Sequence, residues 1–319
     1  MTSRNEPSRD GVESAARRIA GSITRTPLLP LEWRGRRLWA KAECLQQGGA
    51  FKLRGATNRL LQLDDDEKKR GVVAFSSGNH ARGVAIAARR LSIAATIVMP
   101  SDAPAVKRDA TAAEGAEIIL YDRLREDRIA IAARISEQTG AIVVPSFDDI
   151  DIIEGQGTVG VEIRDQLGAE PPLVAVPCGG GGLSSGIALA LPDSTIVPVE
   201  PAGWDDMARS LKLGEIVPVA EGAPATKLDA LQTPVVSPYT FGVLHARGAR
   251  GLSVTDDEAF AAMRFAFDQL RLVVEPGGAA ALAALLADKF GDVPEGSVLV
   301  LSGGNVDPGL YASVLNGAA

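Results

Sequence analysis

Short apolar runs alternate with helix-like stretches along this chain, and this alternation restricts its fold more than any other feature. The strand candidates are residues 72–75, 95–99, 117–120, 142–144, 173–176, 196–199 and 297–301. The helical patterns between the first four are residues 82–91, 105–114 and 127–139. Parallel strands need long crossover connections, and these are usually helices that cover the sheet. The alternation therefore predicts an α/β fold with parallel sheets flanked by helices.

Size and charge limit the classes of function to consider. With 319 residues, of which 46% are hydrophobic, the chain is long enough for two domains and a sizeable core. Its net charge of −7 argues against a nucleic-acid partner. Two cysteines are too few for a disulfide framework, and the sequence has neither an apolar signal core nor a membrane-length apolar window. We expect a cytoplasmic enzyme that binds no membrane.

The segment 48–55, Gly-Gly-Ala-Phe-Lys-Leu-Arg-Gly, places one lysine between an aromatic ring and a glycine-punctuated turn. A primary amine becomes nucleophilic when partial burial or nearby positive charge lowers its pKa. Phe51 and Arg54 flank Lys52, which is therefore a candidate covalent catalyst. The alternative is a solvated helix lysine beside Arg54, since most lysines lie at the surface.

Four consecutive glycines, Gly179 to Gly182, stand between an apolar run and a stretch rich in alanine and leucine. A strand, a glycine loop and a helix in this order let backbone N–H groups converge on an anion, toward which the helix directs the positive end of its dipole. The segment does not end in the Gly-Lys-Ser/Thr of a P-loop, and its glycines do not have the spacing of a first Rossmann turn. It predicts a phosphate site for another kind of ligand, the alternative being a tight connection.

A third segment, Ser76-Ser77-Gly78-Asn79-His80, follows the strand candidate 72–75 and opens a helix. Small polar groups and free amides at a helix N-terminus suit a carboxylate. Simple N-capping of the helix by Ser76 or Ser77 is the alternative.

Together these segments resemble the fold type II pyridoxal-phosphate enzymes, in the branch of serine/threonine dehydratases, serine racemases and hydroxyaspartate dehydratases. Further matching motifs are Gly-Gln-Gly-Thr at 155–158, Glu-Pro at 200–201, Glu-Pro-Gly-Gly-Ala at 275–279 and Ser-Gly-Gly-Asn-Val-Asp at 302–307. The resemblance spans nearly the whole chain. It implies a two-domain fold like the tryptophan synthase β-subunit, with residues 71–148 as a small substrate-turn domain and residues 1–70 plus 149–319 as a large cofactor-binding domain, in a homodimer.

The resemblance also implies roles for individual residues. It makes Lys52 and Ser77 the catalytic pair, with Lys52 carrying pyridoxal 5′-phosphate and moving the substrate α-proton. The implied cofactor contacts are Phe51, Lys52, Asn79, Gly179, Gly180, Gly181, Gly182, Leu183, Glu275 and Ser302. The implied substrate contacts are Ser76, Ser77, Gly78, Asn79, His80 and Arg128. A serine at 302 cannot supply the charge of an aspartate to the pyridine nitrogen, which favours prompt elimination over transamination.

Two further features, Arg128 and residues 200–206, each have a functional and a purely structural interpretation. Arg128 falls where racemase-like members carry an arginine at the active-site entrance, and it would receive a β-carboxylate bidentately, or it is a surface arginine at a helix start. Residues 200–206 are similar to a racemase-type metal loop, in which the carboxylates of Glu200 and Asp206 and the carbonyl of Trp204 ligate Mg²⁺, Mn²⁺ or Ca²⁺. The alternative for this segment is an acidic surface loop.

The expected reaction is β-elimination of water from a β-hydroxy amino acid, giving a 2-oxo acid and ammonia. Serine, threonine and 3-hydroxyaspartate are the candidate substrates. The alternative is a racemase for serine or aspartate, in which Lys52 and Ser77 act on opposite faces. A cofactor carrier without catalysis is a third hypothesis, against which the intact lysine and carboxylate turn argue. Residues 227–230, Lys-Leu-Asp-Ala, depart from the small-residue turn of relatives and are expected to alter the pocket.

Overall fold

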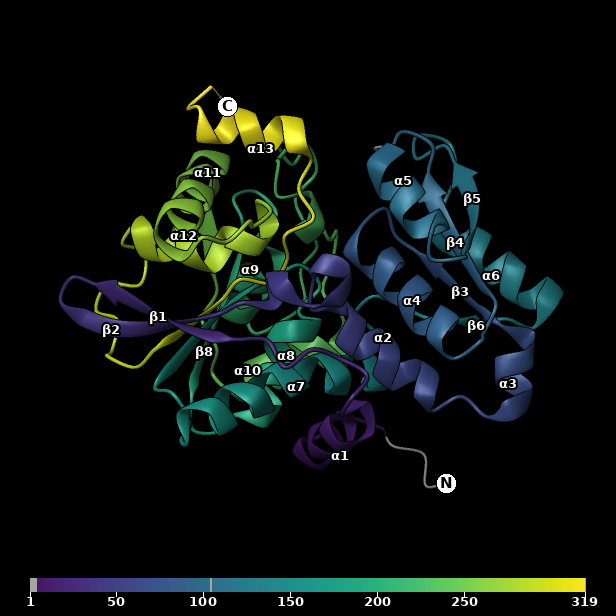
Figure 1. Cartoon of the computed structure of the whole chain (residues 1–319), viewed down its shortest axis with the longest axis horizontal. Helices are drawn as coiled ribbons and strands as arrows, with labels where there is room; N and C mark the ends of the chain where they lie inside the picture. Colours follow the sequence, from purple (N-terminus) through teal and green to yellow (C-terminus); the bar gives the residue numbers. More distant parts are fainter. Residues whose placement is uncertain (1–4, 104, 319) are drawn as a thin grey trace.

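Two β-sheets, each with helices against it, organise the computed structural model, which describes residues 5–103 and 105–318 (Figure 1). The larger sheet has six strands, in the order β1-β2-β10-β7-β8-β9. The smaller has four, in the order β5-β4-β3-β6. In Figure 1 the smaller sheet lies to the right with α4, α5 and α6, and the larger one lies to the left.

The larger sheet is built from both ends of the chain, because β10 lies between β2 and β7. Its strands are β1 (Leu28–Trp33), β2 (Arg36–Lys41), β7 (Leu173–Pro177), β8 (Thr195–Pro201), β9 (Leu252–Val254) and β10 (Val298–Val300). Only the β1–β2 pair is antiparallel; the other pairs are parallel. The β1–β2 hairpin turns at Arg34 and Gly35, both of which have positive φ.

Helices cover both faces of this sheet, so its central strands are apolar on both sides. The helices packed on this sheet or on its covering helices are α1 (Arg9–Ile19), α2 (Lys52–Leu61), α7 (Ile150–Leu167), α8 (Gly182–Ala190), α9 (Asp206–Leu213), α10 (Pro238–Ala246), α11 (Asp256–Phe265), α12 (Ala280–Leu286) and α13 (Pro308–Leu315). In β7, Val174 and Val176 pack in a cluster with α7 and α8, whereas Ala175 packs with α11 and α12. Successive residues of β7 face opposite sides of the sheet, and both sides are covered by helices. The strand is therefore apolar at every position, which explains its continuous apolar run in the sequence.

The smaller sheet is entirely parallel. It consists of β3 (Val72–Phe75), β4 (Ala95–Pro100), β5 (Glu117–Tyr121) and β6 (Ile142–Val143), with helices α3 (Asp65–Arg70), α4 (Asn79–Arg90), α5 (Ala105–Ala112) and α6 (Arg128–Thr139). Val72 and Ala74 face the cluster that contains α4 residues, and Val73 faces the cluster that contains α6 residues. The predicted α/β fold with parallel sheets is confirmed. The division into domains at residues 71 and 148 stays a prediction.

Helix α2, which begins at Lys52, is held by very close helix packing. A Cβ atom added at Gly155 of α7 would lie 2.6 Å from the Cα atom of Gly55 in α2. Such an approach is open only to glycine, because any side chain would push the helices apart. The Gly-Gln-Gly-Thr motif therefore fixes the position of the helix that carries Lys52.

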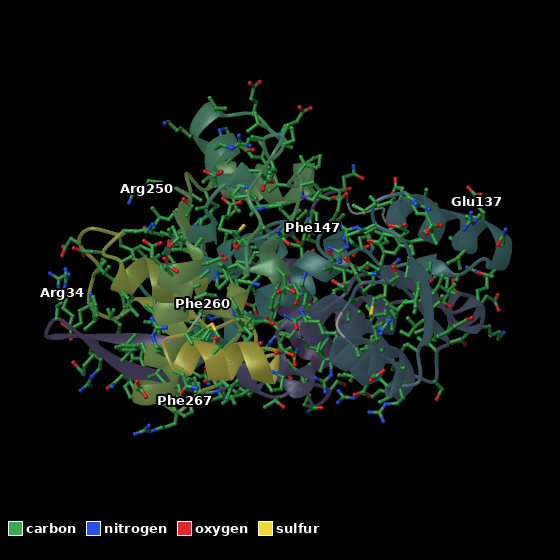
Figure 2. The ribbon with its side chains drawn as sticks, turned by 90° about the horizontal axis from the view of Figure 1, so that it is seen from above. Arg34, Glu137, Phe147, Arg250, Phe260 and Phe267 are labelled. Carbon is green, nitrogen blue, oxygen red and sulfur yellow. The ribbon has the colours of Figure 1, made fainter. Side chains whose placement is uncertain are left out.

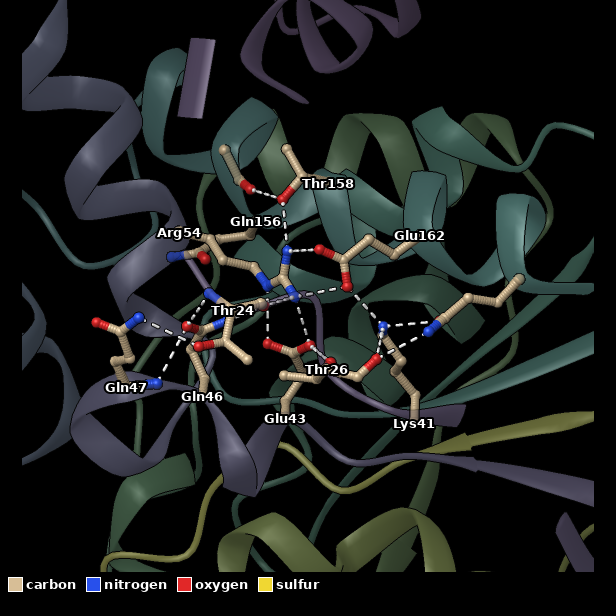
Figure 3. Close-up of polar contacts among 12 residues, drawn as sticks. Thr24, Thr26, Lys41, Glu43, Gln46, Gln47, Arg54, Gln156, Thr158 and Glu162 are labelled. Carbon is tan, nitrogen blue, oxygen red and sulfur yellow. Dashed lines mark hydrogen bonds and ion pairs between the residues drawn. The ribbon is translucent and has the colours of Figure 1, made fainter. Parts of the chain in front are cut away.

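A buried ionic cluster anchors the same helix (Figure 3). The fully buried guanidinium of Arg54 donates to Glu43 Oε1 and Oε2 at 2.7 and 2.8 Å and to Glu162 Oε1 and Oε2 at 2.7 and 2.9 Å. Lys41 Nζ donates to Glu162 Oε2 at 2.6 Å and to the carbonyl oxygen of Thr26 at 2.9 Å. Two cations thus meet two carboxylates, which is the condition under which buried charge is tolerated.

Candidate active site

A cavity of about 590 Å³ lies where the loops that follow the carboxyl ends of β3, β6, β7 and β10 come together. Ligands of open α/β sheets commonly bind at this end of the strands. The predicted cofactor and substrate residues that line it are Phe51, Lys52, Ser76, Ser77, Gly78, Asn79, His80, Arg128, Gly179, Gly180, Gly181, Gly182, Leu183, Glu275 and Ser302. The structure therefore brings all of them into one cavity, and their individual roles stay predictions.

Lys52 is the first residue of α2 and points its amine into this cavity. Its Nζ donates to the carbonyl oxygen of Ser146 at 2.8 Å and lies 5.2 Å from the centroid of the Phe51 ring. Burial lowers the pKa of this amine to about 8. The charge of Arg54 does not lower this pKa, because its guanidinium is paired with carboxylates in the buried ionic cluster. Near physiological pH a far larger share of this amine is therefore unprotonated than in an ordinary lysine, although the ammonium form still predominates.

The glycine loop between β7 and α8 has no room for side chains. Gly181 has a φ of +85°, and a Cβ atom there would lie 2.7 Å from Met207 Cε. A Cβ atom at Gly180 would lie 2.3 Å from Cγ of Phe147, the ring labelled near the meeting of the two sheets in Figure 2. Free backbone amides at the start of α8 remain as donors for an oxyanion. A cradle that only glycine can form fits the phosphate of pyridoxal 5′-phosphate.

The Ser-Ser-Gly-Asn-His turn joins β3 to α4. Its N-cap residue is Gly78, which offers no side chain, so the first turn of α4 is not capped. Ser76 Oγ instead accepts from the N–H of Gly78 at 3.3 Å. The N-capping alternative for Ser76 and Ser77 is therefore wrong. The uncapped amides fit a carboxylate.

His80 is a neutral wall residue. Its ring Nε2 lies 2.9 Å from the carbonyl oxygen of Val144, which makes Nε2 the protonated nitrogen. Burial, together with the charge of Lys52, lowers the pKa of His80 to about 3. The imidazole therefore supports the turn and supplies no positive charge to a carboxylate.

Glu275 and Ser302 also line the cavity, and both are buried. Glu275 Oε1 accepts from Asn79 Nδ2 at 2.5 Å, and burial raises the pKa of Glu275 to about 7. The carbonyl oxygen of Ser302 accepts from the N–H of Phe51 at 3.1 Å, which fixes β10 against the Lys52 segment. Asn305 donates from Nδ2 to Asn79 Oδ1 at 2.8 Å. The only sequence signal for Asn305 was its position in the Ser-Gly-Gly-Asn motif.

Arg128 lines the cavity at the start of α6, with its guanidinium carbon 5.7 Å from the centroid of the Phe75 ring. Arg128 is half-buried, so it is a helix-start arginine that also faces the cavity. Lys107 and Asp229 line the same cavity from α5 and from the loop before α10, and their Nζ and Oδ2 atoms are 2.6 Å apart. No sequence motif predicted this pair, although its acidic member lies in the unusual segment 227–230.

The predicted metal residues lie outside the cavity, at the carboxyl end of β8. Glu200 is fully buried and accepts from the N–H groups of Met207 and Ala208 at 2.9 and 2.8 Å. Asp206 is also buried, and its Oδ2 has no hydrogen-bond partner among the residues that the structure describes. Burial, together with Asp206, raises the pKa of Glu200 well above its usual value, and burial raises the pKa of Asp206 to about 7.

The acidic surface alternative for residues 200–206 is therefore wrong. Two buried carboxylates with a free oxygen fit a hard cation, which the half-buried Trp204 would join through its carbonyl. Among the described residues, no group of three or more His, Cys, Asp or Glu side chains is arranged to hold a metal ion. Any ion here would rely on two side chains, backbone carbonyls and water.

Within residues 5–103 and 105–318, no helix is long and apolar enough to cross a membrane.

A lysine of lowered pKa, a glycine cradle for phosphate and an uncapped helix N-terminus share one cavity in this α/β fold. They define a lysine-dependent enzyme class that holds a phosphorylated cofactor. The family model described as pyridoxal-phosphate dependent enzyme matches residues 19–303, and the chain belongs to this family. The expected family and the expected cofactor are thereby confirmed.

The relatives lie in the branch that the sequence motifs indicated. The chain is 42% identical over 316 residues to L-threo-3-hydroxyaspartate ammonia-lyase from Pseudomonas sp, covering 96% of this chain and 98% of that protein. It is 38% identical to serine racemase from Schizosaccharomyces pombe, covering 97% and 98%. The solved structure of maize serine racemase superposes with a TM-score of 0.90 at 37% identity, covering 98% of both chains.

Proposed function

We propose that this chain is a pyridoxal-phosphate-dependent ammonia-lyase that removes water from a β-hydroxy amino acid and releases a 2-oxo acid and ammonia. The observation that carries the proposal is the Lys52 amine, which shares one cavity with a phosphate cradle and a carboxylate turn. Its pKa of about 8 makes it both a nucleophile and a base near neutral pH. The L-threo-3-hydroxyaspartate ammonia-lyase relative supports the same reaction class.

The roles we propose follow from the positions of the residues. The amides of Gly179 to Gly182 hold the cofactor phosphate, and the first-turn amides of α4 hold the substrate α-carboxylate. Lys52 anchors the cofactor and, once released, takes the α-proton at Nζ. When bound, pyridoxal phosphate supplies an electron sink for the negative charge that develops at the α-carbon. Asn79 would hold the cofactor 3′-oxygen as a hydrogen-bond donor, and Ser302 would contact the pyridine nitrogen.

Within this class we propose 3-hydroxyaspartate as the preferred substrate. Arg128 lines the cavity and lies over the Phe75 ring, where its planar fork could receive a second carboxylate. Serine and threonine lack that carboxylate. A substrate panel of L-serine, L-threonine, D-serine and the hydroxyaspartate stereoisomers tests this, with 2-oxo acid and ammonia as products.

Arg128→Met should lower the turnover of 3-hydroxyaspartate more than the turnover of serine. Equal losses on both substrates would remove the case for a β-carboxylate contact.

A serine or aspartate racemase is the second candidate, because Ser77 lines the same cavity as Lys52. Removal of the α-proton by one residue and its return by the other inverts the α-carbon. Chiral analysis of the remaining substrate, run beside the 2-oxo acid assay, separates the two activities.

We further propose that Glu200, Asp206 and the carbonyl of Trp204 hold a divalent cation, such as Mg²⁺, Mn²⁺ or Ca²⁺. The buried carboxylates and the free Oδ2 of Asp206 support this.

The family resemblance supports a homodimer, with residues 71–148 as the small domain and residues 1–70 plus 149–319 as the large one. The two free, buried cysteines, Cys44 and Cys178, support a protein of a reducing compartment such as the cytoplasm.

A further inference from the structure

Asn305 lies directly behind Asn79, in the loop that follows β10. Its Nδ2 donates to the carbonyl oxygen of Gly48 at 2.7 Å and to Asn79 Oδ1 at 2.8 Å. Its Oδ1 accepts from an N–H of Arg82 at 3.1 Å. All the polar atoms of this amide are therefore engaged, and its three partners come from the Lys52 loop and from α4.

The direction of these hydrogen bonds is dictated by the partners. An arginine side chain only donates, and a backbone carbonyl only accepts. The oxygen of Asn305 must therefore face Arg82, and its nitrogen must face Gly48. Both constraints require the same orientation of the amide, so Asn305 always offers an N–H to Asn79.

Asn79 must therefore accept this hydrogen bond with Oδ1, which places its Nδ2 on the opposite side of the amide. That Nδ2 donates one N–H to Glu275 Oε1 at 2.5 Å. The second N–H makes no hydrogen bond to a described residue, and Asn79 lines the 590 Å³ cavity. An amide that offered its oxygen here would repel any anionic oxygen of a ligand at this wall.

We propose that Asn305 is a positioning residue that makes Asn79 present a donor, not an acceptor, to the cofactor oxygen at this wall. The inference rests on the proposed role of Asn79 as a cofactor contact. A purely structural role is the competing explanation, since Asn305 ties the Gly48 loop to α4. The test must therefore read the state of the cofactor as well as the stability of the fold.

Asn305→Asp is the discriminating substitution because it keeps the shape and replaces both donors with an acceptor. The ionised aspartate pairs with Arg82, and Asn79 must turn its amide to meet it with Nδ2. Asn79 then shows its oxygen to the cavity. We expect pyridoxal phosphate to bind about tenfold more weakly, as for one lost hydrogen bond, and the near-visible absorbance band of the holoenzyme to shift.

Asn316→Asp is the matched control, since it adds the same charge at the exposed end of α13. This control should keep the cofactor affinity and the spectrum of the parent.

A double-mutant cycle with Asn79→Ala separates positioning from structure. In that background Asn305→Asp should change neither the cofactor affinity nor the band, because the amide to be oriented is gone. If Asn305→Asp fails to fold, Asn305→Ala replaces it, and the band should broaden because the Asn79 amide is free to turn.

An unchanged spectrum and affinity in the single variant overturn the inference, as does an equal change in both backgrounds. A parent that binds no pyridoxal phosphate contradicts the proposed function instead.

Discussion

At the scale of residues, the chemistry of this site follows from burial more than from neighbouring charge. Lys52 owes its lowered pKa to desolvation, and Arg54, which stands two positions away in the sequence, is directed into a separate ionic cluster. The sequence identified the lysine but not the reason for its reactivity. Burial depends on the surrounding fold, which a local motif does not reveal.

The lowered pKa of Lys52 predicts a pH-dependent stability of the cofactor-free protein. Between pH 8 and the ordinary lysine pKa of 10.5, the unfolded chain binds the proton that the folded chain has released. Stability contributed by this group therefore rises with pH across that window. In thermal melts, Lys52→Met should be more stable than the parent at pH 7, with a gap that narrows by pH 10. A gap that stays constant would mean that the amine is not desolvated.

Ser77 is predicted to separate the two candidate activities. Ser77→Ala should suppress racemisation by at least tenfold while much of the elimination remains, because elimination needs only the lysine face and a protonated leaving group. Chiral chromatography and a 2-oxo acid assay on the same samples measure both rates. Parallel loss of both activities would make Ser77 a carboxylate or structural residue instead.

At the scale of elements, the sequence predicted the buried parallel strands and missed the β1–β2 hairpin and β9. Buried parallel strands read as continuous apolar runs, whereas β1 contains Pro30 and β2 begins with two arginines. A proline is acceptable in β1 because β1 is an edge strand. Strand β9 has only three residues and gives no periodic signal. Strands β2 and β9 join the sheet by pairing with β10 and β8, which are distant in the sequence, and β1 joins it through its hairpin with β2.

The buried ionic cluster should be essential for the position of α2. Glu43→Gln leaves Arg54 without one of its two carboxylates, and breaking a buried pair costs about 3–5 kcal/mol. Urea denaturation of the holoenzyme measures this loss. Glu32→Gln is the control, because the Glu32 and Arg37 side chains are 66% and 63% exposed and their pair should contribute almost nothing. Similar stabilities for the two variants would contradict the account of the cluster.

The loop between β8 and α9 is predicted to need a cation. Chelation should lower the melting temperature and the activity together, since Glu200 and Asp206 would then be buried as crowded carboxylates. Added Mg²⁺, Mn²⁺ or Ca²⁺ should restore both, with a stabilisation that grows with ion concentration. Asp206→Asn should abolish the ion dependence. If the parent's melting temperature ignores chelator and ion alike, residues 200–206 hold no cation.

At the scale of the whole molecule, two sheets meet around one cavity, and almost every residue that the motifs singled out reaches it. The glycine loop and the Ser-Ser-Gly-Asn-His turn could be placed because each follows a parallel strand, at the end where ligands commonly bind. The remaining site residues, among them Lys52, were placed by the family resemblance. The sequence could not place Lys107 beside Asp229, or Asn305 behind Asn79, because those contacts join distant segments. Local pattern and family resemblance therefore predicted the lining of the site, and tertiary packing decides how its members are oriented.

The central claim is that Lys52 holds pyridoxal phosphate in this cavity, and reductive trapping tests it most directly. Borohydride treatment of the holoenzyme, followed by proteolysis and mass spectrometry, locates the lysine to which the cofactor becomes permanently attached. The account predicts the added mass on the peptide that contains Lys52, loss of the near-visible band, and loss of elimination activity in proportion. Attachment to a different lysine, or full activity after Lys52 is modified, would contradict it.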